Sequence, residues 1–256
     1  MPKAGFDFSV FFAFACGKIV PGMKPQRLLC FGHRGACGHE PENTLRSVRK
    51  ALELGADGIE VDVYFADGQL VVIHDRTLGR TTNGSGFVTR KSFAYLRSLD
   101  AGLGGHIPTL AEVFDTVDHH AVINVELKGP RTAAPVVTLI DEYVRHRGWR
   151  YDEFLVSAFD HSQLREAKKL QPEIRLGALI EKSPRGLAAF AEQLGAWSIN
   201  HSKECVTAEL VSDAHRRGLK VFVFTVNEPG DIARMARLGV DGVFSDFPER
   251  VTKASL

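Results

Sequence analysis

The chain has 256 residues, of which 44% are hydrophobic, 25% charged and 9% aromatic. This composition excludes a disordered chain, a collagen-like chain and a small disulfide-stabilised protein, and a chain of this length can bury a large core. The 32 basic residues nearly balance the 31 acidic ones, which leaves a net charge of +1. No overall basic field therefore favours binding to nucleic acid or to an anionic membrane.

Residues 1–22 are predicted to form an N-terminal tail outside the folded domain, which spans 23–256. The apolar stretch of the tail, 10–16, is far shorter than the roughly 20 residues that cross a bilayer. The tail also has a weakly basic start and no clear cleavage site. We therefore expect a cytoplasmic protein without stable membrane insertion, with an export or lipoprotein signal ending at Cys16 as the alternative.

Four cysteines are present, and their spacing is not that of a metal-binding motif or of a CxxC motif. This usage agrees with reduced thiols in a cytoplasmic compartment. The sequence gives no indication of the oligomeric state. The cysteines are Cys16, Cys30, Cys37 and Cys205.

Short apolar runs rich in β-branched residues alternate with helical patterns along the whole chain. The patterns predict strands at 28–31, 58–65, 121–127, 154–158, 175–180, 197–200, 220–226 and 242–245, with an extra hairpin arm at 70–74. They predict helices at 43–54, 131–146, 161–170, 185–193, 206–217 and 229–238. Eight β–α repeats favour an α/β protein with a single closed (β/α)8 barrel, a TIM barrel. No GxGxxG motif follows the first strand, which weighs against a dinucleotide-binding sheet.

One stretch, 75–108, breaks this alternation. It holds two glycine-rich segments, 83–86 and 102–105, and a short helical pattern at 92–99. We interpret it as a short insertion on the barrel rim, after the second strand and its hairpin arm.

Acidic residues occur where functional residues of such a barrel are expected, towards the C-terminal ends of strands. Glu60 and Asp62 lie two residues apart on one predicted strand, so both side chains point to the same face. Glu126 follows on the next barrel strand. Three carboxylates near the mouth of a barrel would repel one another unless a cation lay between them. The oxygen-rich set predicts Mg²⁺ or Ca²⁺ as the cofactor, in preference to zinc.

Two histidines lie beside this acidic set. His33 ends the first strand, and His74 ends the hairpin arm. A three-residue loop at 66–68 would place His74 opposite Glu60 on the same face, whereas a two-residue loop would place it opposite Val61 and facing away. We expect the three-residue loop, because the two imidazoles could then act as general base and general acid near neutral pH.

Two basic residues lie at strand ends that already carry candidate residues: Arg34 follows His33, and Lys128 lies two residues after Glu126. Arginine suits bidentate contact with a phosphate, and lysine acts as a point charge. They supply the positive charge that a phosphodiester anion requires.

Seven short motifs together resemble the glycerophosphodiester phosphodiesterase family over about residues 28–250. They are His33-Arg34-Gly35, Pro41-Glu42-Asn43-Thr44, Gly58-Ile59-Glu60-Val61-Asp62-Val63, Val72-Ile73-His74-Asp75, Arg80-Thr81-Thr82-Asn83-Gly84, Glu126-Leu127-Lys128 and Thr225-Val226-Asn227. The resemblance implies a (β/α)8 barrel, a divalent metal ion, and hydrolysis of a small glycerophosphodiester to sn-glycerol 3-phosphate and an alcohol. It also matches 75–108 to the short insertion of the cytosolic bacterial members, which forms a lid.

The resemblance further implies roles for individual residues. His33 and His74 would be the acid–base pair, Glu60, Asp62 and Glu126 the metal ligands, and Arg34 and Lys128 the phosphoryl-binding residues, while Glu42 would orient Arg34. Phe224 stands where the family often has tryptophan, so an apolar wall beside the glycerol remains without an indole N–H. The nucleophile would be water or the glycerol 2-hydroxyl, and the family favours the latter, through a cyclic phosphate.

Two other functions fit the same residues. One is a lysophospholipase D or sphingomyelinase D-like activity on lipid phosphodiesters, which needs a wide apolar mouth. The other is a non-catalytic barrel that binds phosphoesters, which the presence of both histidines and all three acids disfavours.

Overall fold

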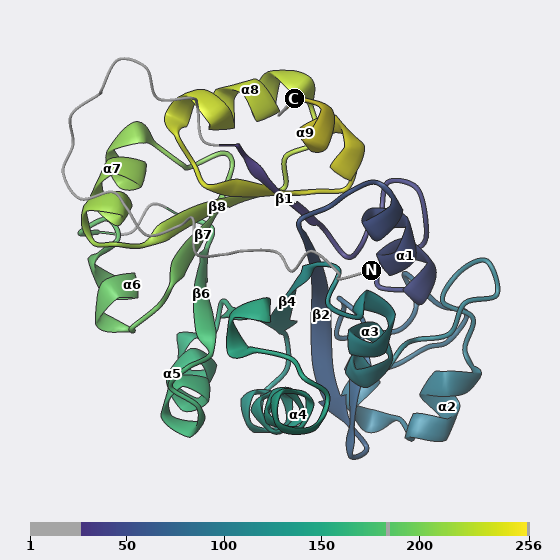
Figure 1. Ribbon diagram of the computed structural model, residues 1–256. Helices are drawn as coiled ribbons and strands as arrows, with labels where there is room; N and C mark the ends of the chain where they lie inside the picture. Colours follow the sequence, from purple (N-terminus) through teal and green to yellow (C-terminus); the bar gives the residue numbers. More distant parts are fainter. Residues whose placement is uncertain (1–26, 183–184, 255–256) are drawn as a thin grey trace.

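The parallel strands of the computed structural model, which describes residues 27–182 and 185–254, close into a barrel (Figure 1). β1 (Leu29–Gly32) pairs with β9 (Gly242–Ser245) on one side and with β2 (Gly58–Ala66) on the other, which joins the two ends of the sheet. The remaining barrel strands, in order from β2 towards β9, are β4 (Val122–Leu127), β5 (Phe154–Ala158), β6 (Arg175–Ile180), β7 (Ser198–Ser202) and β8 (Lys220–Phe224). The predicted TIM barrel is confirmed.

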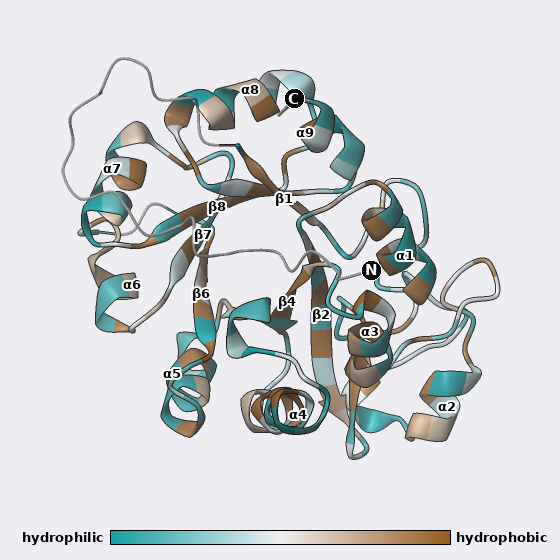
Figure 2. Cartoon of the chain, viewed as in Figure 1, coloured by the Kyte–Doolittle hydropathy of each residue, from teal (hydrophilic) through white to brown (hydrophobic). Residues whose placement is uncertain are grey.

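Helices surround the barrel and follow its strands in chain order (Figure 1). They are α1 (Leu45–Glu53), α3 (Leu110–Val117), α4 (Ala133–His146), α5 (His161–Leu170), α6 (Ala189–Gln193), α7 (Ala208–Arg216), α8 (Pro229–Leu238) and α9 (Pro248–Ala254). Their apolar faces turn towards the apolar strands, and their hydrophilic faces turn outward (Figure 2). This arrangement buries both faces of each parallel strand, as the near-continuous apolar runs require.

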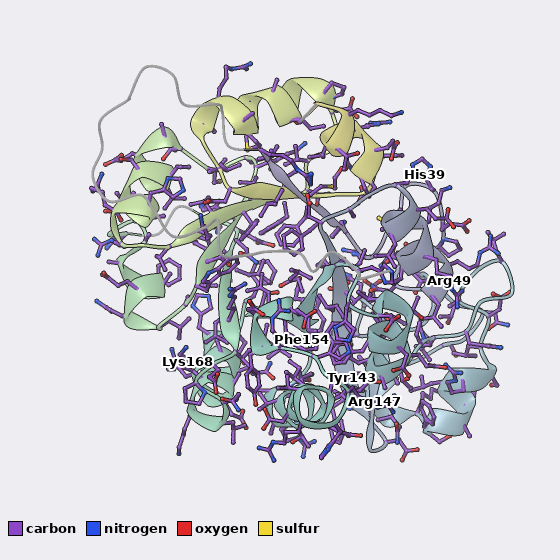
Figure 3. The ribbon with its side chains drawn as sticks, viewed as in Figure 1. His39, Arg49, Tyr143, Arg147, Phe154 and Lys168 are labelled. Carbon is purple, nitrogen blue, oxygen red and sulfur yellow. The ribbon has the colours of Figure 1, made fainter. Side chains whose placement is uncertain are left out.

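Aromatic side chains fill the space between the barrel and the helices α3 and α4. The ring of Phe114 on α3 lies 4.9 Å from that of Phe154 on β5 and 5.0 Å from that of Tyr143 on α4, measured between centroids. Phe154 and Tyr143 are buried, whereas Lys168 lies on the outer side of α5 (Figure 3). A shared aromatic core therefore holds both helices against the barrel.

Two helix ends show how the free backbone groups are capped. Thr44 caps α1 by accepting a hydrogen bond from the backbone N–H of Ser47, and Gly239 ends α8 in a left-handed conformation. Both devices satisfy backbone groups that the ends of a helix leave free.

Two helices were not predicted. α3 begins at a capping box in which Thr109 and Glu112 bind each other's backbone, directly after the insertion. α9 follows the last strand. The glycine-rich insertion ends one residue before Thr109, so its loop signals lie next to the start of α3.

Several boundaries differ from the predicted ones by one to four residues. β7 continues to Ser202, β8 ends at Phe224, two residues early, and α6 starts at Ala189, four residues later than predicted. Differences of this size are common, because the residues at the end of a helix or strand make fewer of the regular backbone hydrogen bonds that define the element.

The hairpin of β2 with β3 (Gln69–Val72) corrects one expectation. Ala66 pairs with Gln69, so the loop consists of the two residues Asp67 and Gly68 rather than the three predicted residues 66–68. Both loop residues have positive φ angles, 48° and 75°, as a tight two-residue hairpin requires. In this register, His74 would be the partner of Val61.

Residues 75–108 leave the barrel after β3 and pack around a small apolar core that they share with β2 and β3, to one side of the ring of helices (Figure 1). The segment contains the 3-10 helix η2 (Val88–Arg90) and α2 (Phe93–Ser98); a further 3-10 helix, η3 (Tyr151–Glu153), precedes β5. The segment returns beside β3, where the N–H of Val72 donates to the carbonyl of Pro108. It is attached where the site residues of β2 lie.

The predicted tail, 1–22, lies outside the described residues. Within 27–182 and 185–254, no helix combines the length and the apolar character that crossing a membrane requires.

Candidate active site

Three carboxylates from neighbouring strands meet inside one end of the barrel. Glu60 and Asp62 share a face of β2, and the strand register places Asp62 beside Glu126 of β4. Ligand oxygens of all three residues lie within 4.8 Å of one another. The structure thus brings together the three acids that the sequence proposes as metal ligands.

These acids are crowded and buried, with 3% of Glu60 and 1% of Asp62 exposed. Burial, followed by the charges of Asp62 and Glu126, raises the pKa of Glu60 well above its usual value. One oxygen of Glu60, Oε1, is buried without a hydrogen-bond partner among the described residues. An unpaired buried oxygen between other carboxylates is the donor environment that a hard divalent cation stabilises.

Two cations face the same acids. Nζ of Lys128 donates to Oε1 of Glu126 at 2.6 Å and lies 3.5 Å from Oδ1 of Asp62. Burial acts against the lysine ammonium group, but Glu126 and Asp62 outweigh it and raise its pKa, so Lys128 stays charged. The backbone N–H of Arg34 donates to Oε2 of Glu60 at 2.8 Å, and Nε of Arg34 lies 3.4 Å from Oδ2 of Asp62.

His33 follows β1 and is held by a carboxylate after β9. Its Nδ1 lies 2.7 Å from Oδ1 of Asp246, and the other oxygen of Asp246 accepts a hydrogen bond from Asn227 at 2.6 Å. Burial opposes ionisation of Asp246, but the bonds from His33, Cys37 and Asn227 outweigh it and lower its pKa. Because an ionised carboxylate only accepts hydrogen bonds, Nδ1 of His33 carries the proton and Nε2 is left for chemistry.

His74 has the same arrangement on the other flank. Its Nδ1 lies 2.6 Å from Oδ1 of Asp75, and Nε of Arg80 donates to Oδ2 of Asp75 at 2.6 Å. The bonds from Arg80 and His74 lower the pKa of Asp75, which keeps it ionised. Burial lowers the pKa of His74 and so favours its neutral form.

His74 faces the cavity although the hairpin register predicted the opposite orientation. β3 ends at Val72, and the chain turns out of the strand after the N–H of Ile73 has donated to the carbonyl of Asp62 at 2.9 Å. His74 therefore lies beyond the pairing that would have turned it away. The end of the strand, rather than the loop length, sets its direction.

Glu42 links the barrel to the insertion. Its Oε1 accepts from Nη1 of Arg34 at 2.8 Å, and its Oε2 accepts from Nη1 of Arg80 at 2.7 Å. Arg80 is a residue of the insertion and also binds Asp75. One chain of ion pairs therefore joins Arg34 of the first strand end to the carboxylate behind His74.

A cavity of about 210 Å³ connects these groups. Its polar lining consists of His33, Arg34, Glu60, His74, Asn124, Glu126, Lys128, Glu181 and Thr225. Its apolar lining includes Phe224 and Phe159, whose ring centroids lie 5.9 Å apart, together with Leu179 and Phe244. Asp62 lies beneath the cavity floor, because its side chain is almost fully buried.

Sequence reasoning assigned no role to four residues that support this site. Asp246 and Asp75 hold the two histidines, Arg80 holds Asp75, and Asn43 donates to Oδ2 of Asp62 at 2.8 Å. The sequence offered a signal for each of them. Asp75 follows His74, Asn43 follows Glu42, and Arg80 begins one of the quoted motifs. Asp246 directly follows the last strand, where functional residues of a barrel are expected.

Comparisons with known proteins agree with this geometry. Residues 33–250 match the model of the "Glycerophosphoryl diester phosphodiesterase family". A glycerophosphodiester phosphodiesterase of Caldanaerobacter subterraneus is 37% identical over 238 residues, covering 87% of this chain and 96% of that protein.

Solved structures show the same likeness. A phosphodiesterase of Oleispira antarctica, solved in complex with the product sn-glycerol-3-phosphate, is similar with a TM-score of 0.82 and 32% identity, over 88% of this chain and 96% of that one. A glycerophosphodiester phosphodiesterase of Thermotoga maritima has a TM-score of 0.74 and 27% identity, over 89% and 98% of the two chains. Both likenesses span the barrel and the strand ends that carry the site.

Proposed function

Because this chain belongs to the glycerophosphoryl diester phosphodiesterase family, we propose that it hydrolyses small glycerophosphodiesters to sn-glycerol 3-phosphate and an alcohol. The observation that carries the proposal is the shared cavity. Two histidines, each held by its own carboxylate, line it together with Glu60, Glu126 and Lys128. The relative bound to sn-glycerol-3-phosphate supports this product class.

Glu60, Asp62 and Glu126 would hold a divalent ion, Mg²⁺ or Ca²⁺. The unpaired Oε1 of Glu60 and the purely oxygen donor set support a hard cation. When bound, the ion would supply positive charge to the phosphoryl oxygens and to the glycerol hydroxyls.

Arg34 and Lys128 would bind and orient the phosphodiester anion from the polar side of the cavity. Glu42 would fix the guanidinium of Arg34 through the 2.8 Å hydrogen bond, so that its free N–H groups point to the phosphate. Phe224 would cover the apolar face of the glycerol and exclude water from that side.

His74 would accept the proton of the nucleophile, since burial favours its neutral form. His33 would donate a proton from Nε2 to the departing alkoxide, with Asp246 stabilising the imidazolium before transfer. Attack forms one P–O bond and breaks the bond to the alcohol, which leaves protonated. If the glycerol 2-hydroxyl attacks, the product is a cyclic phosphate that water then opens, and phosphorus NMR of the reaction mixture distinguishes the two routes.

The aromatic pair Phe159 and Phe224 is the observation that favours a lipid substrate, because 43% of Phe159 is exposed at the mouth. The cavity volume of about 210 Å³ supports the small substrates instead, since an acyl chain would have to lie outside it. A non-catalytic barrel does not account for two histidines that are each held in the tautomer that acid–base transfer needs.

A chelator-controlled assay tests the proposal. Glycerophosphocholine, glycerophosphoethanolamine and lysophosphatidylcholine are offered to the protein in EDTA and then with added Mg²⁺ or Ca²⁺. We expect sn-glycerol 3-phosphate from the first two only when an ion is added. Full activity in EDTA would rule out the metal role, and a strong preference for lysophosphatidylcholine would favour the lipid reaction.

A further inference from the structure

Cys37 lies against the pair formed by His33 and Asp246. Its Sγ donates to Oδ1 of Asp246 at 2.9 Å and lies 4.0 Å from Nδ1 of His33. With the 2.7 Å contact between His33 and Asp246, three potential ligand atoms of three different kinds lie within 4.8 Å of one another. This group, the His33–Cys37–Asp246 triad, does not include Glu60, Asp62 or Glu126.

The donor set differs in chemistry from that of the acidic cluster. An imidazole nitrogen, a sulfur and a carboxylate oxygen form a ligand set typical of Zn²⁺, whereas three carboxylates suit Mg²⁺ or Ca²⁺. Ligand distances of about 2.0–2.3 Å place tetrahedral donor atoms roughly 3.3–3.8 Å apart. The observed separations of 2.7, 2.9 and 4.0 Å bracket that range, so small side-chain movements would form the site.

The triad is open to solvent as well as close together. The side chains of His33 and Asp246 are 20% and 24% exposed, so the triad is not sealed from solvent. Asn227 holds Oδ2 of Asp246 and leaves Oδ1 facing His33 and Cys37.

We propose that His33, Cys37 and Asp246 form a second metal site, which takes Zn²⁺ or another thiophilic divalent ion and thereby inhibits the enzyme. Without an ion the thiol of Cys37 donates its proton to Oδ1 of Asp246, and an ion that binds the sulfur displaces this proton. Binding releases that proton and the Nδ1 proton of His33 to solvent. A cation on Nδ1 replaces the contact with Asp246 and opposes protonation at Nε2, which removes the proposed general acid.

Cobalt absorption tests the site without an activity measurement. Co²⁺ bound by a thiolate gives a near-ultraviolet charge-transfer band, and oxygen ligands such as those of Glu60 and Glu126 do not. We expect the full chain to show this band on titration with Co²⁺, and Cys37→Ser to lose it. Cys205→Ser is the matched control and keeps the band. A band that survives in both Cys37→Ser and Cys37→Ala overturns the proposal.

Zinc inhibition is the second arm, and it alone rests on the proposed role of His33. Hydrolysis of glycerophosphocholine is measured with saturating Mg²⁺ and increasing Zn²⁺. We expect Cys37→Ser to require roughly 10- to 100-fold more Zn²⁺ than the unmodified protein for half-inhibition. Cys205→Ser should match the unmodified protein. Equal inhibition of all three proteins overturns the inhibitory site, whereas an inactive zinc-free protein would count against the proposed function and leave the cobalt result decisive.

Discussion

Each of the two candidate catalytic histidines is held by one carboxylate, and the two carboxylates lie at very different distances from their histidines along the chain. Asp75 is the neighbour of His74 in the chain, but Asp246 is more than two hundred residues from His33. Both carboxylates bind Nδ1, and both leave Nε2 for the cavity. The proposal that His74 acts as the base and His33 as the acid rests on the lowered pKa of His74.

Removing either imidazole should affect the chemical step. His33→Ala and His74→Ala are each expected to lower kcat by roughly 10²–10⁴, because a general acid or base is lost. Steady-state kinetics with glycerophosphocholine measure this, and circular dichroism verifies folding. His146→Ala, at an exposed helix end, is the control. A change confined to KM would argue against acid–base roles.

The pH profile tests the base. Since burial lowers the pKa of His74, the acid limb of kcat/KM should lie below about 6.5, the ordinary value for histidine. The hydrogen bond that His74 donates to Asp75 opposes this lowering. Asp75→Asn should therefore move the acid limb to still lower pH, because His74 then stays neutral in more acidic solution.

The control for this shift is Asp118→Asn, at a left-handed helix end that asparagine also tolerates. Its profile should coincide with that of the unmodified protein. A limb that moves to higher pH in Asp75→Asn would contradict the assignment of the base.

At the scale of elements, the insertion contacts the candidate active site, and α3, the helix that follows the insertion, contributes to the stability of the fold. Arg80 of the insertion binds Glu42 and Asp75, and α3 begins at Leu110, two residues after Pro108, where the insertion returns to β3. The capping box of Thr109 and Glu112 fixes that return. We regard α3 as the element that holds the insertion in place.

Thr109→Ala should lower the free energy of unfolding by about 1 kcal/mol, the usual effect of removing an N-cap side chain. Urea unfolding measures the change. Thr138→Ala, on an exposed part of α4, is the control and should be neutral or slightly stabilising, since alanine is the better helix former. An equal loss in both variants would show that the cap contributes nothing specific.

At the scale of the whole molecule, closure of the barrel assembles the site. β1, β2, β4 and β9 each deliver one part: His33, the pair Glu60 and Asp62, Glu126, and Asp246. Closure also forces three carboxylates into a small buried volume. The fold therefore stores electrostatic repulsion that a bound cation would relieve.

Ion binding should consequently stabilise the protein. Ca²⁺ or Mg²⁺ at 100 times its dissociation constant is expected to add about 2.7 kcal/mol to the free energy of unfolding, because the ion binds only the folded site. Thermal unfolding with and without the ion, after EDTA treatment, measures this. Glu60→Gln should abolish most of the shift and should raise the melting temperature of the ion-free protein, since the amide has no ionised form for burial and the neighbouring carboxylates to disfavour.

Glu209→Gln, an exposed position on α7, is the control and should keep the full shift. A melting temperature that does not respond to either ion in the unmodified protein would count against the metal site.

The sequence by itself determined the (β/α)8 barrel, because eight apolar strands alternate with amphipathic helices and each pattern is local. It also determined the membership of the acidic set, since Glu60 and Asp62 share a strand face whatever the rest of the chain does. The predicted strand ends also singled out His33, His74, Arg34 and Lys128, and the motif resemblance then implied their roles.

Only the tertiary structure decided which distant groups touch. The hairpin loop was predicted wrongly, yet His74 faces the cavity, because β3 ends early and the chain leaves its register. Asp246 reaches His33, and Cys37 joins them, because β9 closes against β1. Contacts of this kind depend on barrel closure, which sums interactions over the whole chain. A place at a strand end can therefore mark a residue such as Asp246, but it does not identify the residue that Asp246 contacts.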